Sequence, residues 1–332
     1  MSTSDVAVRA VGLQKRYKQT RALDGFELAV PYGMVYGLLG PNGAGKTTAV
    51  RILTTLLRLD GGTAEVAGYD VTRQQRLVRR RIGLTGQQTT VDDLISARDN
   101  LVLFGRLLHV GRAAAGRRAD ELLEQFSLTD AAATQPKHFS GGMRRRLDLA
   151  SSMILAPQVL FLDEPTTGLD PAGRREVWQA VRDLAAGGTT VLLTTHYLDE
   201  ADKLCDRIGV IDHGRNVVED SPEGLKRRIG NERLEIVAAE PDHLGTIAEL
   251  ATGAGRDGTA PTIDETALVV SVPVADGVRA LTEVAAELRT RGVAVADLGL
   301  RRPTLDEAFL QLTGQAGVQH RSERTDAMEA TA

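Results

Sequence analysis

The chain has 332 residues and a single cysteine, Cys205. One cysteine cannot form a disulfide within the chain, so no covalent cross-link stabilises the fold. The scarcity of cysteine is typical of proteins that work in a reducing compartment. We expect Cys205 to be a small buried apolar side chain rather than a reactive thiol.

Long apolar runs are also lacking. No run approaches the ~18 residues that a membrane-spanning helix requires, and residues 1–5 lack the charged and then apolar pattern of a secretory signal. An excess of positive charge is missing too, because the net charge is −4. A broad nucleic-acid-binding surface is therefore not expected, and the sequence predicts a cytosolic protein without a nucleic-acid partner.

The remaining composition is ordinary for a globular protein, with 42% hydrophobic and 25% charged residues. The length suits about two domains, and Ser-Pro and Gly-Asn pairs mark a linker at 221–231. Residues 6–220 are expected to form an α/β domain in which about 92–156 is a helical insertion. Residues 232–314 predict a small α+β domain of order β-α-β-α-β-α, and 315–332 a disordered polar tail.

A glycine-rich stretch between a short apolar run and a helix-compatible run dominates the first domain. Residues 35–39 are expected to form a buried strand and residues 49–57 a helix. Between them, Gly-x-x-x-x-Gly-Lys-Thr at 40–47 is the P-loop pattern, and strand, loop and helix are the context it requires. The residues expected to cradle the nucleotide's phosphates are Gly40, Pro41, Asn42, Gly43, Ala44, Gly45, Lys46, Thr47 and Thr48.

The chemistry of this stretch suits phosphate. Glycines let consecutive N–H groups turn inward, and those donors together with the positive end of the helix attract phosphate oxygens. Lys46 adds a charge for the β- and γ-phosphates, and the Thr47 hydroxyl can ligate Mg²⁺. The alternative is a plain glycine-rich turn between strand and helix.

Acidic and histidine residues follow two further apolar runs. Asp163 and Glu164 end the run at 159–163, and His196 ends the run at 189–195. Such runs predict strands of a parallel sheet buried on both faces, whose ends carry ligand groups. We expect Asp163 to hold Mg²⁺, Glu164 to polarise a water and His196 to donate to the γ-phosphate. Acids that merely face solvent and an ordinary loop histidine are the alternatives.

A second anion site is predicted at Ser140-Gly141-Gly142, which opens an amphipathic helix. Ser140 is a good N-cap residue, and the glycines leave the first N–H groups of the helix accessible. One nucleotide needs one phosphate cradle, so two cradles suggest that each nucleotide is shared between two chains. A capped helix without a ligand is the alternative. The following Arg144, Arg145 and Arg146 could face phosphate or a partner, or form a solvated face.

The ordered set of motifs resembles the ATP-binding cassette (ABC) proteins over residues 6–220. The set comprises the P-loop at 40–47, Gln87, Ser140-Gly-Gly, Asp163-Glu164-Pro165, Gly168-Leu-Asp170 and His196. The resemblance implies ATP and Mg²⁺ as cofactors, and a P-loop NTPase sheet with a helical insertion. Before the P-loop, Tyr17 is an aromatic that could stack on a base or be an ordinary loop residue.

Individual roles also follow from the resemblance. Tyr17 looks like the base-stacking aromatic, and Gln87 like the loop residue that senses Mg²⁺ and the membrane partner. The Ser140-Gly-Gly segment looks like the signature that closes over the ATP of a second subunit. Asp170 looks like a residue of the dimer interface, and Glu164 like the catalytic base. Met143 replaces the usual signature glutamine, and a thioether cannot make an amide's hydrogen bonds.

A narrower resemblance links residues 139–150, 84–87 and 302–310 to the daunorubicin/doxorubicin-resistance type of exporter ATPase. It implies a homodimer that lies peripherally at the cytoplasmic side of the membrane and powers a separate integral-membrane permease. The cargo would be a hydrophobic, drug-like compound, and residues 232–314 would dock or regulate. Export rather than import rests on this resemblance alone. A soluble cassette acting on ribosomes or DNA is the alternative, although the chain shows one cassette and no sustained heptads.

Overall fold

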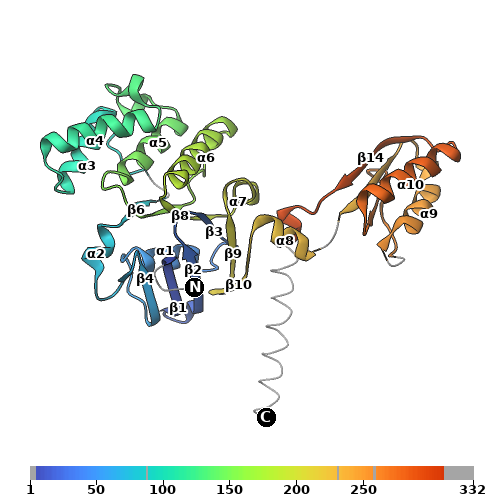
Figure 1. Ribbon diagram of the computed structural model, residues 1–332, viewed down its shortest axis with the longest axis horizontal. Helices are drawn as coiled ribbons and strands as arrows, with labels where there is room; N and C mark the ends of the chain where they lie inside the picture. Colours follow the sequence, from blue (N-terminus) through green and yellow to red (C-terminus); the bar gives the residue numbers. More distant parts are fainter. Residues whose placement is uncertain (1–4, 87–88, 230–231, 257–258, 310–332) are drawn as a thin grey trace, which may run out of the picture. The chain divides into compact units, whose positions relative to one another are not determined.

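A computed structural model of the chain describes residues 5–86, 89–229, 232–256 and 259–309 (Figure 1). The chain divides into two compact units, Met1–Pro222 and Glu223–Ala332. No helix in the described ranges is long and apolar enough to cross a bilayer. The tail at 315–332, predicted to be disordered, lies outside the described residues.

A six-stranded sheet of order β10-β9-β3-β8-β7-β6 forms the centre of the first unit. All its pairings are parallel except that of the edge strand β10 with β9. Three of the inner strands, β3, β7 and β8, are buried at every residue, which explains their continuous apolar sequence. The strands are β3 (Val35–Leu39), β6 (Ile82–Thr85), β7 (Val159–Asp163), β8 (Thr190–Thr195), β9 (Arg207–Asp212) and β10 (Arg215–Asp220).

An antiparallel sheet of order β2-β1-β4-β5 packs with the P-loop helix into one hydrophobic core. Its strands are β1 (Val6–Tyr17), β2 (Thr20–Pro31), β4 (Gly61–Val66) and β5 (Tyr69–Asp70). Leu13 and Phe26 from this sheet join Tyr36 and Ile52 in that core. An ion pair of 2.9 Å between Arg215 on β10 and Asp24 on β2 also joins the two sheets.

The helices of the first unit lie against these sheets or form the predicted insertion. In Figure 1, α3, α4 and α5 lie together beside α6. Side chains cap three of the helices, because Ser96, Ser140 and Asp170 accept hydrogen bonds from the first turns of α3, α5 and α6. The helices are α1 (Lys46–Leu53), α2 (Gln75–Arg79), α3 (Ala97–Leu107), α4 (Arg112–Gln125), α5 (Gly141–Ser152), α6 (Pro171–Ala186) and α7 (Leu198–Leu204).

The helix expected at 49–57 is placed differently in the structure. It begins at Lys46, because the backbone of Gly45 (φ 113°) already turns the chain into the helix. It ends at Leu53, and Thr55 has the left-handed φ of 64° that terminates helices. The first helical turn therefore carries the P-loop lysine and threonine.

The second unit contains an antiparallel sheet of order β12-β13-β11-β14 together with the helices α8, α9 and α10. Its elements are α8 (Pro222–Ile229), β11 (Arg233–Ala238), α9 (Leu244–Ala254), β12 (Thr262–Asp264), β13 (Val269–Pro273), α10 (Gly277–Thr290) and β14 (Val295–Arg301). From β11 to β14 the order is β-α-β-β-α-β, the ferredoxin-like arrangement. The predicted order was wrong because it lacked β12, whose three residues are all exposed and show no alternation.

The two units have separate hydrophobic cores. The larger one is built from β1, β2, β3, β4 and α1, and the smaller one from β11, β13, α9 and α10. Since the two clusters have no residue in common, each unit buries its own apolar surface.

We predict that a chain ending at Gly230 folds and binds ATP with an affinity within about threefold of the full chain, because the larger core stays intact. Titration with a fluorescent ATP analogue and thermal unfolding check this, with full-length Lys46→Ala as the non-binding control. A truncated chain that cannot bind ATP would contradict the prediction.

Candidate nucleotide site

The P-loop joins the carboxyl end of β3 to the start of α1 through a backbone that requires glycine. Gly45 has a φ of 113°, and a Cβ there would lie 2.5 Å from the Ala22 carbonyl oxygen. A Cβ on Gly40 would collide with the carbonyl oxygen of Ile211. The loop is therefore pressed against neighbouring backbone on its inner side, and its outer residues, Pro41 to Gly43, are exposed.

The first turn of α1 is uncapped. Gly45 is the N-cap residue, and within the described residues no side chain accepts a hydrogen bond from this turn. By contrast, α3, α5 and α6 each carry a side-chain cap. Free N–H groups at the positive end of a helix are a phosphate-binding arrangement, so the fold keeps these donors available for an anion.

Lys46 is buried at this turn, with 6% of the residue exposed. Its Nζ donates to the carbonyl oxygens of Gly40 at 2.6 Å and of Pro41 at 3.1 Å. Burial lowers the pKa of Lys46, whereas the nearby carboxylates of Glu164 and Asp163 act in the opposite direction. Among the described residues, the hydrogen-bond partners of the ammonium are neutral oxygens, so a phosphate would be a much stronger partner.

The two predicted acids lie at the end of β7. Asp163 is buried and accepts a hydrogen bond from the Thr194 hydroxyl on β8. Glu164 is the next residue, and its backbone N–H donates to the Thr194 carbonyl oxygen at 3.1 Å. Glu164 has a φ of 52°, a left-handed conformation that costs a residue with a side chain about 1–3 kcal/mol. The strand therefore ends in a strained turn at Glu164, whose carboxylate is near enough to Lys46 to act on the pKa of its ammonium.

His196 follows β8 and lies beside the same carboxylate. Its Nδ1 is 3.4 Å from Oε1 of Glu164, and its side chain is partly exposed. The sheet order explains the grouping, because β3, β8 and β7 are neighbours and parallel, so their carboxyl ends meet at one edge. The structure thus brings together Lys46, Asp163, Glu164 and His196, as the sequence predicted.

The signature segment lies apart from this cluster. Ser140 is exposed, and its hydroxyl accepts a hydrogen bond of 3.1 Å from the Met143 N–H. Within the described residues, no hydrogen bond or ion pair links Ser140-Gly-Gly to the P-loop. The capping bond takes up the Met143 N–H. The predicted second cradle would therefore use the N–H groups before it, those of Gly141 and Gly142.

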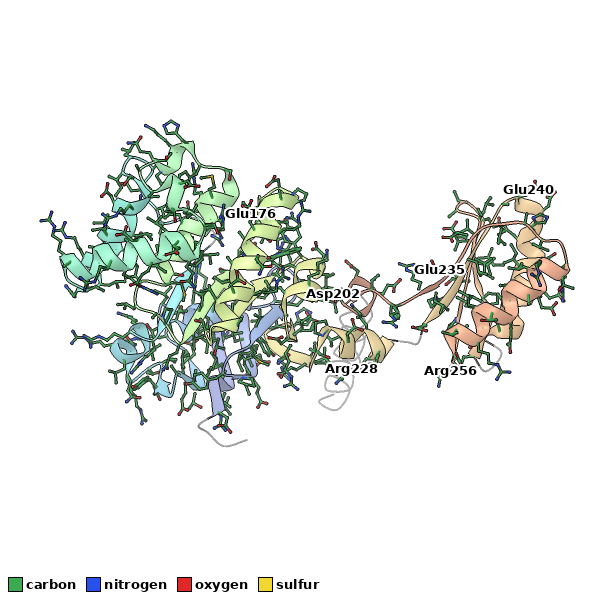
Figure 2. All side chains as sticks on the ribbon, turned by 45° about the horizontal axis from the view of Figure 1, so that its top comes forward. Glu176, Asp202, Arg228, Glu235, Glu240 and Arg256 are labelled. Atoms are coloured by element: carbon green, nitrogen blue, oxygen red, sulfur yellow. The ribbon has the colours of Figure 1, made fainter. Side chains whose placement is uncertain are left out.

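The starts of α5 and α6 pack closely together. A Cβ on Gly142 would lie 3.1 Å from the Cα of Gly173 on α6. Asp170 caps α6 by accepting from the Gly173 N–H at 3.0 Å. Further along, Arg146 on α5 forms an ion pair of 3.2 Å with Glu176, which is labelled on α6 in Figure 2. The segment at Ser140 and the residue predicted at the dimer interface, Asp170, therefore belong to one packed surface.

Two further ATP contacts were predicted, Tyr17 and Gln87. Tyr17 is the last residue of β1 rather than part of a loop, is 44% exposed, and has the Lys15 Nζ 5.9 Å from its ring centroid. Gln87 lies outside the described residues. Its flanks are held by α5, because Gly86 accepts from Arg145 at 2.7 Å and Thr90 donates to Asp148 at 2.9 Å.

The oxygen ligands near the P-loop fit Mg²⁺. Mg²⁺ is commonly bound by one or two protein oxygens together with substrate phosphates and waters. Thr47 on the first turn of α1 and Asp163 at the end of β7 offer a hydroxyl and a carboxylate. No group of three or more His, Cys, Asp or Glu side chains suited to a metal occurs among the described residues. The site therefore fits an ion that arrives with a nucleotide.

Sequence reasoning missed several buried charged residues near the site. Arg145 is 5% exposed, Asp148 2% and Glu200 0%. For Arg145 a solvated face was one open expectation, and the structure excludes it. Little in the sequence pointed to them, because besides the ion pair between Arg145 and Asp148 they bind groups far away along the chain, at Pro165, Thr90 and Thr166.

The P-loop, the acids at the end of β7 and the capped helix after an insertion define a nucleotide-binding cassette of the P-loop NTPase class. The family model for ABC transporters matches residues 23–167. A solved ATP-binding cassette, described as a dimeric post-hydrolysis state bound to ADP and phosphate, is 26% identical with a TM-score of 0.57 and covers 64% of this chain and 98% of that one.

Two curated relatives resemble nearly the whole chain. Daunorubicin resistance ATP-binding protein DrrA2 of Streptomyces coeruleorubidus is 61% identical over 328 residues and covers 98% of each chain. Daunorubicin/doxorubicin resistance ATP-binding protein DrrA of Streptomyces peucetius is 50% identical and covers 93% of this chain and 92% of that one. The chain belongs to the ATP-binding subunits of ABC transporters, in the DrrA daunorubicin-resistance family, and is an ABC-type ATPase. The predicted cassette fold with an additional C-terminal region is confirmed.

We predict that Gly45→Ala lowers ATP affinity at least about tenfold, because the new Cβ must displace the Ala22 carbonyl and thereby the first turn of α1. Gly188→Ala is the matched control: its φ of 93° is also positive, but a Cβ there meets nothing within 4 Å. The control should lose about 1–2 kcal/mol of stability and keep its ATP affinity. Equal ATP affinities of the two variants in a nucleotide titration would contradict the prediction.

Proposed function

We propose that this chain hydrolyses ATP to power the export of a hydrophobic, daunorubicin-like compound through a separate integral-membrane permease. The observation that carries the proposal is the joint position of Lys46, Asp163, Glu164 and His196 at neighbouring strand ends. The two DrrA relatives, whose names include daunorubicin resistance, support the nature of the cargo.

Within this proposal, the P-loop holds the triphosphate and Tyr17 stacks on the base. Mg²⁺, when bound, neutralises charge that develops on the phosphates, and Thr47, Asp163 and Gln87 would hold it. Glu164 accepts a proton from the attacking water, and the 3.4 Å approach of His196 keeps that carboxylate oriented near the γ-phosphate. Lys46 would exchange its carbonyl partners for phosphate oxygens.

We infer that two copies share each ATP. Ser140 is exposed at the start of α5 and has no link to the P-loop of its own chain among the described residues. A second copy, placed head to tail, would put Ser140, Gly141 and Gly142 over the γ-phosphate and Asp170 at the interface. The close packing of α5 on α6 supports this arrangement, because Ser140 and Asp170 would approach the partner together.

The permease would contact the helical insertion. Leu103 and Leu107 on α3 and the preceding Leu94 are exposed, with 63% of Leu107 and 69% of Leu94 accessible. Leu103 and Leu107 are four residues apart and so share one face of α3, and exposed apolar patches often mark protein-binding surfaces. The chain would thereby lie peripherally at the cytoplasmic side of the membrane, and the ferredoxin-like unit would dock or regulate. Nothing in the site favours nucleic acid as a partner.

The test is efflux of daunorubicin from cells that co-express the chain with an integral-membrane permease. We predict that Glu164→Gln abolishes efflux, because loss of a general base slows hydrolysis about 10²–10⁴-fold. Glu65→Gln, the same change at an exposed residue of β4, should leave efflux unchanged. Retained drug in cells with the unmodified pair would refute drug export, and retained efflux with Glu164→Gln would refute its catalytic role.

A further inference from the structure

The dipeptide Pro165-Thr166 connects the strained turn at Glu164 to the segment that ends at Asp170. Two buried side chains of opposite charge hold it from different helices. Arg145 on α5 donates from Nε to the Pro165 carbonyl oxygen at 2.8 Å. The Thr166 hydroxyl donates to Oε1 of Glu200 on α7 at 2.7 Å. The dipeptide is thus fixed on both sides immediately after Glu164.

Both side chains are themselves held in place. Glu200 is fully buried, and its Oε1 also accepts from Nε1 of Trp178 on α6 at 3.0 Å. Arg145 donates from Nη1 to the Gly86 carbonyl oxygen at 2.7 Å and forms an ion pair of 3.3 Å with Asp148. Side chains whose rotamers are locked in this way can hold the backbone that they contact in one position.

Neither charge is fully satisfied. Among the described residues, Nη2 of Arg145 and Oε2 of Glu200 are buried and have no hydrogen-bond partner. Burial lowers the pKa of the Arg145 guanidinium, and the carboxylates of Asp148 and Glu200 act in the opposite direction. Buried charges with unused polar atoms are unfavourable for stability, and well-packed apolar residues would stabilise such a position as well or better. Stability alone therefore does not account for this pair.

We propose that Arg145 and Glu200 are positioning residues for ATP hydrolysis, which clamp Pro165-Thr166 so that the Glu164 carboxylate is held at the attacking water. The left-handed backbone of Glu164 supports the need for a clamp, because strained conformations persist only where surrounding contacts enforce them. The Thr194 carbonyl holds the N–H of Glu164 on the strand side. The clamp supplies the restraint on the other side.

The clamp also explains why the residue on α5 is an arginine. Arg145 binds two carbonyl oxygens from two different nitrogens, Pro165 from Nε and Gly86 from Nη1, a geometry that the single nitrogen of an ammonium does not reproduce. The segment that precedes Gln87 and the segment that follows Glu164 are therefore tied to one side chain of α5. A movement of α5 changes both segments together, so the rate of hydrolysis depends on where the signature helix lies.

The experiment compares Thr166→Val with Thr166→Ser in the full-length chain. Valine keeps the shape of threonine but cannot donate to Glu200, whereas serine keeps the hydroxyl. For Thr166→Val we expect kcat to fall about 10- to 100-fold while KM for ATP stays within about twofold, since misplacement of a base affects the chemical step. Thr166→Ser should retain most of the kcat of the unmodified chain.

Thr54→Val is the matched control for lost stability. Thr54 is also buried, but its hydroxyl donates to the Val50 carbonyl oxygen within its own helix. It should lower the melting temperature as Thr166→Val does and leave kcat unchanged. Arg145→Lys is the second variant, because lysine keeps the charge but cannot span both carbonyls; it should also lower kcat at constant KM.

The proposal is overturned if folded Thr166→Val or Arg145→Lys keeps its kcat. It is equally overturned if Thr166→Ser fails to retain kcat, or if Thr54→Val loses as much kcat as Thr166→Val. A loss of ATP affinity with kcat preserved would also contradict it, because that result would place the clamp in binding rather than in hydrolysis.

Discussion

The structure depends on a helix whose first N–H groups have no side-chain partner among the residues that the structure describes. Gly45 caps α1 without a side chain, and beside it the buried Lys46 ammonium donates, within the same residues, to carbonyl oxygens alone. Unpaired donors and a buried cation cost free energy unless an anion completes them. The site is therefore built for a ligand that carries several negative oxygens, and the neighbouring strand ends bring the groups that act on it.

The predicted site residues do not all lie beside the phosphate cradle. Asp163, Glu164 and His196 share its edge of the sheet, because β3, β8 and β7 are adjacent and parallel. Ser140 belongs to α5 and, within the described residues, is bonded only to its own helix. One chain thus has the P-loop and the acidic and histidine side chains at one place and the N–H groups at the start of α5 at another, an arrangement that we propose a pair of chains completes.

Local spacing was enough to predict the P-loop, the acids and His196, because each motif follows a continuous apolar strand. The start of α1 was misplaced by three residues, since the left-handed φ of Gly45 is not visible in a hydrophobic pattern. The strand β12 was missed because exposed residues carry no alternation. Arg145 and Glu200 were missed for another reason. The Pro165 carbonyl that Arg145 binds and the Thr166 hydroxyl that Glu200 binds lie 20 and 34 residues away, so only the folded chain shows these contacts.

The measurement that tests the shared-nucleotide claim most directly is disulfide cross-linking between two single-cysteine chains. With Cys205→Ala and Glu164→Gln in both, one chain carries Asn42→Cys in the exposed P-loop and the other Ser140→Cys. Mixed with ATP, they should form a cross-linked pair that is absent without ATP and with Lys46→Ala, because each triphosphate binds both chains. A further chain carries both Asn42→Cys and Ser140→Cys. The account would be contradicted if the mixture forms no cross-linked pair while this further chain forms a disulfide only within itself.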